Sequence, residues 1–192
     1  MSAPTADALI QRLNLQPHPE GGYFRQTWVA EAKDGARPAG TCIYFLLKAG
    51  ENSHWHRVDA VEIWHYYAGA PLVLSLSETD RGPARDVMLG PDFTQDQEPQ
   101  QIVPKGVWQA ARSTGDYTLV GCTVSPGFRF EGFELAPRGF DIPAPELRRG
   151  GSVRKNAKKP EETPAGREDG ESRALFPRNF FPKVRIPALA LN

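Results

Sequence analysis

The chain has 192 residues, of which 40% are hydrophobic, and its formal net charge at pH 7 is zero. Residues 1–137 carry 11 Lys and Arg against 16 Asp and Glu, which excludes the basic surface typical of proteins that bind nucleic acid. No apolar run approaches the roughly 18 residues that a membrane-spanning helix needs, so we expect no membrane partner.

The first element that the sequence predicts is a short helix over residues 5–14. Thr5 can cap its first turn, and an apolar stripe at helical spacing follows, made of Leu9, Ile10 and Leu13. Two prolines and the pair Gly21-Gly22 then interrupt regular structure. We therefore expect a loop between this helix and the next element.

From residue 23 to about residue 136 the pattern is typical of short β-strands separated by turns that contain Gly, Pro and Asp. About ten strands of this kind indicate an all-β sandwich or barrel. The predicted strands are 23–29, 41–47, 53–57, 61–67, 72–77, 85–89, 100–103, 107–112, 117–125 and 130–135. Residues 41–47 are continuously apolar, which predicts a strand covered on both faces.

The composition changes after residue 137. Residues 138–192 carry 12 Lys and Arg against 7 Asp and Glu, and residues 148–173 have almost no large apolar side chains. Such a segment cannot bury enough apolar surface to offset the entropy lost on ordering. We predict a folded domain over residues 1–145 and a basic, Pro- and Gly-rich tail over 146–192 that is largely disordered or extended.

Three of the four histidines lie within twelve residues, at positions 54, 56 and 65. Because side chains alternate along a strand, His54 and His56 should point to the same side. A hairpin after the polar residues Arg57 and Asp59 would bring Glu62 beside them. Two imidazoles and a carboxylate indicate a divalent-metal site or a proton-transfer site.

Four other side chains are candidates for ligand binding. Tyr23 and Arg25 share one face of their strand, and Arg25 could hold a carboxylate or phosphate, or form a salt bridge within the sheet. Trp64 and Tyr66 share the parity of Glu62, so they should point inward with it. They would either pack in the core or form walls for a sugar or a nucleobase. His65 should face the opposite side.

The two cysteines, Cys42 and Cys122, lie in separate strand-like runs and form no CxxC motif. The N-terminus does not have the basic start and apolar stretch of a signal peptide. We therefore expect two buried thiols and a cytoplasmic protein.

The histidine region reads Gly50-x3-His54-x-His56-x5-Glu62-x6-Gly69, and Pro104-x-Gly106-x2-Gln109 follows it. These two stretches resemble the signature motifs of the cupin superfamily, G-x5-HxH-x3,4-E-x6-G and G-x5-PxG-x2-H-x3-N. Several longer phrases resemble the cupin_5 family, also called DUF985. They are LQPHPEGGYFR (15–25), IYFLL (43–47), HWHR (54–57), EIWH (62–65), VPKGVWQA (103–110) and GFELAP (132–137).

The resemblance implies a cupin double-stranded β-helix, a jelly-roll barrel, preceded by a short helix and followed by an irregular tail. It assigns the ligand positions of one divalent metal ion (Mn, Fe, Ni or Zn) to His54, His56, Glu62 and Gln109. Gln109 stands where metal-binding cupins have histidine, and the interval between His56 and Glu62 is longer than the usual one. The alternative is a metal-free pocket in which His56 and Glu62 hydrogen-bond to each other. The resemblance also implies that the loop around His18 folds over a pocket.

Three functions remain open from the sequence. In the first, His56 and Glu62 are catalytic residues of an isomerase, epimerase or lyase that acts on a small polar, sugar-like molecule, with or without metal. In the second, the barrel is a non-catalytic module that binds a sugar or a nucleobase. In the third, the chain is a structural or scaffold protein that binds partners through its basic tail. Cupin barrels commonly pair through edge strands, which covers those edges, so the resemblance also implies a homodimer.

Overall fold

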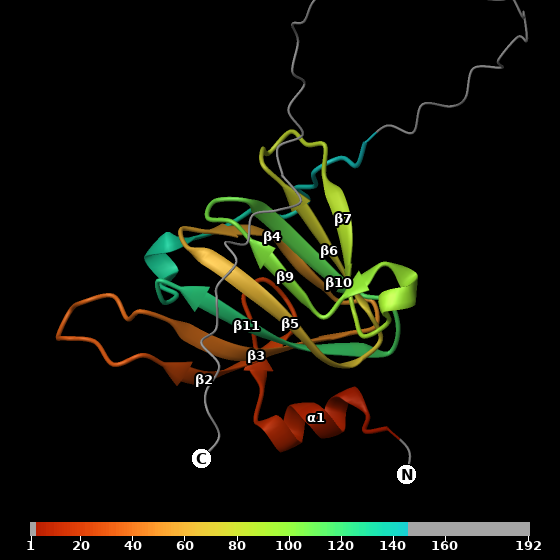
Figure 1. Ribbon diagram of the computed structural model, residues 1–192, viewed down its shortest axis with the longest axis horizontal. Coiled ribbons are helices and arrows are strands. Elements are labelled where there is room, and N and C mark those ends of the chain that lie inside the picture. The colour runs from red at the N-terminus through yellow and green to blue at the C-terminus, as the bar shows by residue number, and fades with distance from the viewer. Residues whose placement is uncertain (1–2, 146–192) are drawn as a thin grey trace, which may run out of the picture. The chain divides into compact units, whose positions relative to one another are not determined.

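The computed structural model describes residues 3–145 of the chain, and the predicted tail over residues 146–192 lies outside the described residues. Within the described part, two six-stranded sheets face each other, as Figure 1 shows. The prediction of an all-β fold with one short N-terminal helix is confirmed.

Helix α1 (Ala6–Leu13) begins and ends within one residue of its predicted limits. The hydroxyl of Thr5 accepts a hydrogen bond from the backbone N–H of Ala8, and Asn14 ends the helix in the left-handed conformation. Leu9 packs with buried residues of two strands, among them Leu46 and Leu119. The helix therefore covers part of the outer face of one sheet, below β3 in Figure 1.

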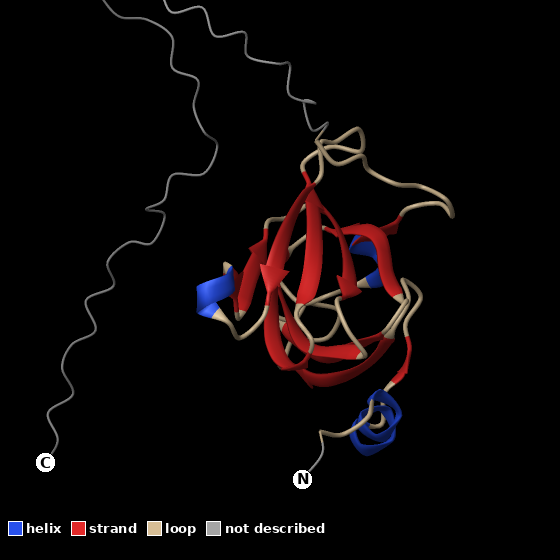
Figure 2. Cartoon of the chain, turned by 90° about the vertical axis from the view of Figure 1, so that its right-hand side faces the viewer, coloured by secondary structure: helices blue, strands red, loops and turns tan. Residues whose placement is uncertain are grey.

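That sheet, the first, has the strand order β1 (Gln16–Pro17), β2 (Tyr23–Val29), β3 (Thr41–Lys48), β11 (Tyr117–Ser125), β5 (Val61–Gly69) and β9 (Gln100–Val103). The second sheet has the order β12 (Phe133–Leu135), β4 (Asn52–Val58), β10 (Trp108–Ser113), β6 (Leu72–Ser77), β7 (Arg85–Leu89) and β8 (Gln97–Glu98). All pairs of neighbouring strands are antiparallel except β7 and β8. In Figure 2 the strands of both sheets curve around a common interior.

The predicted strands match the observed ones with two differences. The short strands β1 and β8 were missed, because two-residue polar stretches carry no periodic signal. The predicted strand over 130–135 is instead a single 3₁₀ turn, η2 (Phe130–Gly132), followed by β12. The backbone carbonyl of Gly132 accepts from the N–H of Asp59, so this segment is bonded to the β4–β5 turn. A further 3₁₀ turn, η1, spans Phe93–Gln95.

Side chains between the sheets form the main core at one end of the barrel. Strand β3 shows how the alternation works, because Phe45 and Leu47 point into this core while Leu46 points outward beneath α1. Both faces of β3 are thus covered, which explains its continuous apolar sequence and confirms that prediction. The other buried members of this core are Trp64, Leu72, Leu74, Leu76, Leu89, Val103, Ala111, Val120 and Cys122. None of the helices within residues 3–145 has the length and apolar character needed to cross a membrane.

Candidate functional site

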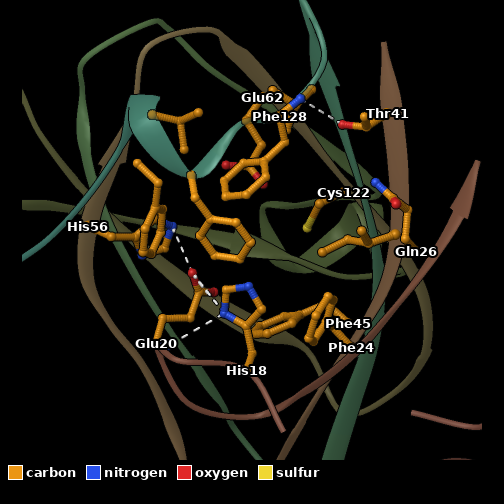
Figure 3. A pocket seen from close by; sticks show the side chains of 15 residues that line it. His18, Glu20, Phe24, Gln26, Thr41, Phe45, His56, Glu62, Cys122 and Phe128 are labelled. Carbon is orange, nitrogen blue, oxygen red and sulfur yellow. Dashed lines mark hydrogen bonds and ion pairs between the residues drawn. The ribbon is translucent and has the colours of Figure 1, made fainter. Parts of the chain in front are cut away.

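A cavity of about 300 Å³ lies between the two sheets, beside the main core. This volume is at the small end of the range of about 300–1,000 Å³ that is usual for ligand pockets. Figure 3 shows the fifteen described side chains that line it, which come from both sheets and from two loops. They are His18, Glu20, Phe24, Gln26, Thr41, Ile43, Phe45, His56, Val58, Glu62, Cys122, Val124, Phe128, Phe130 and Phe133.

Glu20 is the centre of the polar part of this lining. One carboxyl oxygen, Oε1, accepts a 2.9 Å hydrogen bond from the hydroxyl of Ser53. The other, Oε2, lies 3.4 Å from Nε2 of His56 and 3.5 Å from Nδ1 of His18. Burial disfavours the charged carboxylate and raises the pKa of Glu20 to about 7, against smaller opposing effects of His18 and Ser53. Glu20 can therefore gain or lose a proton near neutral pH.

The position of His56 determines which of its ring nitrogens is available. Nδ1 lies 2.8 Å from the backbone carbonyl of His54, and a carbonyl oxygen can only accept a hydrogen bond. Nδ1 therefore carries the proton of the neutral ring, and Nε2 presents its lone pair toward Glu20. Burial lowers the pKa of His56, and the charge of Glu62 opposes this only in part. The neutral imidazole, which can act as a base, is the favoured form.

Glu62 is held by a chain of hydrogen bonds from the second sheet and the core. The indole N–H of Trp64 donates to Oε1 of Gln109 at 3.0 Å. Because an indole N–H can only donate, this bond sets the orientation of the amide, and Nε2 of Gln109 donates to Glu62 at 2.5 Å. Burial raises the pKa of Glu62, while His56 lowers it. Burial also raises the pKa of the Cys122 thiol well above its usual value, so Cys122 remains protonated beside Glu62.

The loop between α1 and β2 carries His18 and Glu20 into the barrel because two glycines allow a close turn. Gly21 has a φ of 110°, and a Cβ there would lie 2.2 Å from the carbonyl oxygen of Asn52. The turn is stabilised by backbone hydrogen bonds from His18 to Gly22, from Gly21 to His18 and from His54 to Glu20. The approach of the loop to β4 therefore needs glycine at this position.

The prediction that His54 and His56 share one side of their strand is wrong. Pairing of β4 with β10 matches His56 to Gln109 and Ser53 to Ala111, so β4 contains one extra residue in this interval. Such a β-bulge reverses the parity of the residues beyond it. As a result Ser53 and His56 both reach Glu20, whereas Nε2 of His54 lies 3.0 Å from the carbonyl of Pro137, outside the cavity lining.

Strands β4 and β5 also do not pair as the predicted hairpin. They belong to different sheets, so His56 and Glu62 approach the cavity from opposite walls (Figure 3). The carboxyl group within 4 Å of His56 is that of Glu20, in place of the expected bond to Glu62. The alternative of a direct His56–Glu62 hydrogen bond is thus replaced by a contact between His56 and Glu20.

The four predicted metal ligands do not fit a metal ion. His54 is turned toward Pro137, and both ends of the Gln109 amide are occupied, one by Trp64 and the other by Glu62. An amide nitrogen that donates to a carboxylate has no lone pair for a metal. Within residues 3–145, moreover, no group of three or more His, Cys, Asp and Glu side chains is arranged to hold one. We therefore derive no metal-dependent step.

The predicted binding residues of β2 lie on its outer face. The guanidinium of Arg25 stacks over the ring of Tyr44 at 5.5 Å, and the ring of Tyr23 lies 5.0 Å from Nζ of Lys48. Phe24 and Gln26, which have the opposite parity, line the cavity. Tyr23 and Arg25 are therefore not among the residues that line this cavity, and their role in ligand binding stays a prediction.

Trp64 and Tyr66 do point inward, but they belong to the core beneath the cavity. Trp64 is 1% exposed and packs edge-on against Phe45, with ring centroids 5.9 Å apart. Tyr66 packs against the same core, and its hydroxyl donates to the carbonyl of Gly69. Neither forms a wall of the cavity, so the structural alternative is the correct one. His65 faces outward as predicted, between Gln100 and Thr123.

Sequence reasoning missed Glu20 and the three phenylalanines Phe128, Phe130 and Phe133. The loop that contains Glu20 was noted for its resemblance to the family, but its carboxylate was not singled out. Its position between a histidine and a glycine pair was the available signal. Phe128 and Phe130 occupy the connection between β11 and β12, and Phe133 is the first residue of β12.

Comparison with known proteins was made for both sequence and fold. A family model described as "Cupin superfamily (DUF985)" matches residues 7–136. A search among curated proteins found no significant relative.

Three of the solved structures that resemble this chain differ in their degree of similarity to it. Protein SO0799 from Shewanella oneidensis is 40% identical, with a TM-score of 0.66 over 70% of this chain and 85% of that chain. A hypothetical protein from Leishmania major is 34% identical, with a TM-score of 0.63 over 71% of this chain and 90% of that chain. Oxalate decarboxylase from Bacillus subtilis is 12% identical, with a TM-score of 0.48 over 62% of this chain and 29% of that chain.

Proposed function

This chain belongs to the DUF985 family of the cupin superfamily, and we propose that its barrel binds one small molecule and moves protons on it, as an isomerase, epimerase or lyase. The observation that carries the proposal is the contact of Glu20 with His56. An acid and a base lie 3.4 Å apart in the lining of a buried cavity, and the acid has a pKa of about 7. General acid–base catalysis works best when such groups titrate near the working pH.

In the proposed reaction, Nε2 of His56 removes a proton from a carbon next to a carbonyl group of the substrate. The electron pair of the broken C–H bond moves toward the carbonyl oxygen, which takes the proton of Glu20, so that the substrate becomes an enol. The imidazolium of His56 is then stabilised by the carboxylate of Glu20 that this transfer leaves. Return of a proton to the other face, or to the neighbouring atom, gives an epimer or an isomer. These two reactions need no oxidant or reductant, because they only rearrange the substrate.

The surroundings of the pair favour this chemistry. Glu20 is held by Ser53 and approached by His18, so its carboxyl group is oriented before a substrate binds. The ring of Phe133 lies 5.4 Å from that of His56 and limits the access of water to the base. A dry site strengthens the interaction between the charges that develop during proton transfer.

Exchange of substrate protons with solvent deuterium tests the proposal. The protein is incubated in D₂O with small ketones, including hydroxyacetone, dihydroxyacetone and aminoacetone, and the loss of the proton signal next to the carbonyl is followed by NMR. We expect accelerated exchange with at least one ketone, and its loss in both His56→Gln and Glu20→Gln. His65→Gln, on the outer face of the same barrel, is the matched control and should retain exchange. Exchange that survives in both cavity variants would contradict the proposed roles.

A second candidate is the non-catalytic binding module. It is favoured by the lining itself, because eight of the fifteen described lining residues are apolar and five of these are phenylalanine. Such a wall would bind an apolar group without any chemical step. Tight binding of a ligand that is recovered unchanged, with no deuterium incorporated, would favour this function over catalysis.

A further inference from the structure

The cavity is lined by acidic side chains but not by lysine or arginine. Two carboxyl groups, Glu20 and Glu62, line it together with two histidines, while no lysine or arginine is found among its fifteen described lining residues. A site that binds carboxylates or phosphates normally provides a cation, most often an arginine. The lining therefore offers an anionic ligand no charged partner beyond the histidines, whose pKa values burial lowers.

The basic residues on the neighbouring segments are turned away from the cavity and already have partners. Arg25 stacks on Tyr44 at the outer face of the first sheet. Both terminal nitrogens of Arg37 bind the carboxylate of Asp59.

Arg57, on the second sheet, is also turned away from the cavity and already has partners. Its guanidinium lies 4.8 Å from the ring centroid of Trp108 and bonds to Glu134 at 2.6 Å. None of these three arginines can reach a ligand in the cavity without leaving its partner. The absence of a cation from the lining is thus built into the packing of both sheets.

The wall beside the carboxyl groups is aromatic. The rings of Phe128, Phe130 and Phe133 lie edge to face, with centroids 5.1 to 6.4 Å apart. The first two residues are in the connection that follows β11, and Phe133 begins β12. The face of an aromatic ring carries partial negative charge and attracts cations. An apolar wall next to two carboxyl groups therefore suits a molecule with an apolar body and a positive head.

The titratable groups that face Glu20 also favour a ligand with a positive charge. His18 and His56 contact it directly, and the charges of Glu62 and Glu20 act on each other and on the thiol of Cys122. Burial disfavours the charged form of all five groups. A cation would favour the ionised carboxylates and so drive the release of protons to solvent.

We infer that the occupant of the cavity is a small cation, an amine with an apolar body, which places its ammonium group beside Glu20 and Glu62 and its body against the phenylalanine wall. This assignment deepens the proposed function, because it names the class of substrate for the same site. It excludes phosphorylated and carboxylated molecules as preferred substrates.

Three probes of one shape and different charge test the inference: benzylamine, benzyl alcohol and benzoate. Binding to the full-length protein is measured by calorimetry at pH 7. We expect benzylamine to bind at least roughly tenfold more tightly than benzyl alcohol, and benzoate to bind more weakly than either. Repeating the benzylamine titration in buffers of different ionisation enthalpy should show net release of protons.

Two variants test whether the preference for the amine depends on a carboxyl group of the cavity. Glu62→Gln should weaken benzylamine by roughly tenfold and leave benzyl alcohol within a factor of two or so, because only the cation loses a charged partner. Glu134→Gln, which removes an exposed carboxylate on the outer face, is the matched control and should change neither. A preference for benzoate, equal binding of the amine and the alcohol, or no binding of benzylamine at millimolar concentration would each overturn the inference.

The inference and the proposed function can fail separately. If benzylamine is preferred but no ketone exchanges its protons, the inference of a cationic ligand is supported and the proposed catalytic function is contradicted. If exchange is observed but the preferred ketones are neutral or anionic, the catalytic function is supported and the inference of a cationic ligand is contradicted.

Discussion

Oε2 of Glu20 lies 3.4 Å from Nε2 of His56, so a loop that precedes the barrel supplies the acid that faces the base on β4. Neither residue could form this pair without the bulge in β4, which turns His56 and Ser53 to the same side. The contact therefore connects the loop before β2 to the wall of the cavity that lies between the two sheets.

The pH dependence of stability should reveal Glu20. Its pKa is raised from 4.5 to about 7 by burial, so between these values the folded protein binds more protons than the unfolded chain. Stability contributed by Glu20 is therefore present at low pH and lost as pH rises through this window. We expect the free energy of unfolding of the wild type, relative to Glu20→Gln, to fall by about 3 kcal/mol between pH 4 and pH 8. Urea denaturation at several pH values measures this difference.

The histidines act in the opposite direction, and the comparison with the variant removes them. Burial lowers the pKa values of His18 and His56, so their contributions favour folding as pH rises. Because both histidines are present in Glu20→Gln, their contribution largely cancels in the difference. A difference that does not change with pH would show that Glu20 ionises normally.

The rate of proton exchange should depend on pH in the form of a bell. His56 must be unprotonated, so the rate rises through its lowered pKa, below the ordinary 6.5. Glu20 must hold its proton, so the rate declines above about 7. In Glu20→Asp, which shortens the side chain and keeps the carboxyl group, the alkaline limb should persist with a lower maximum. Glu134→Gln should leave the whole pH profile unchanged. Loss of the decline at high pH in this control would show that the decline does not arise from Glu20.

The loop glycine should be necessary for the site. Gly21→Ala places a Cβ 2.2 Å from the carbonyl oxygen of Asn52 and strains a φ of 110°, so the loop must move and Glu20 with it. We expect a loss of about 2 kcal/mol or more of stability together with loss of ligand binding. Gly35→Ala is the control, since it also has a positive φ of 73° but no atom within 4 Å of its Cβ. Thermal unfolding and calorimetric binding of benzylamine compare the two variants, and equal effects would contradict a specific role for Gly21.

The amide of Gln109 should stabilise the protein and hold Glu62. Gln109→Leu leaves both the indole N–H of Trp64 and the carboxyl of Glu62 without their bonds, which costs about 1–3 kcal/mol for a buried polar group. It should also raise the pKa of Glu62 further, because the amide hydrogen bond lowers it. Gln100→Leu, which removes an exposed amide on β9, is the control for the loss of an amide. Denaturant unfolding checks the first effect, and a stability equal to that of the control would show that the chain of bonds is dispensable.

Removal of metal should leave this protein unchanged. The amide of Gln109 is occupied at both ends and His54 lies outside the cavity lining, so the predicted ligand set is not assembled. We expect dialysis of untagged protein against a chelator to leave its melting temperature and its affinity for benzylamine unaltered. Stoichiometric manganese, iron, nickel or zinc that is retained by the wild type and lost in His56→Ala would contradict this assignment.

The outline of the fold could be predicted because it depends on local pattern. The helix at the N-terminus followed from Thr5 and an apolar stripe, and strand β3 followed from a run that fills the barrel on one side and meets α1 on the other. The family resemblance was confirmed by the match over residues 7–136. Alternation along a strand also correctly placed Glu62 and Trp64 inward and His65 outward.

The site could be predicted only in part, because its geometry depends on partners distant in the chain. The pattern of the sequence by itself determined the strands and the inward carboxylate, since these follow from periods of two residues. Only the tertiary structure decided that a bulge against β10 turns His54 outward, and that two glycines let Glu20 take its place beside His56. The register of a bulge and the path of a loop are set by the neighbouring strand, and no local periodicity records them.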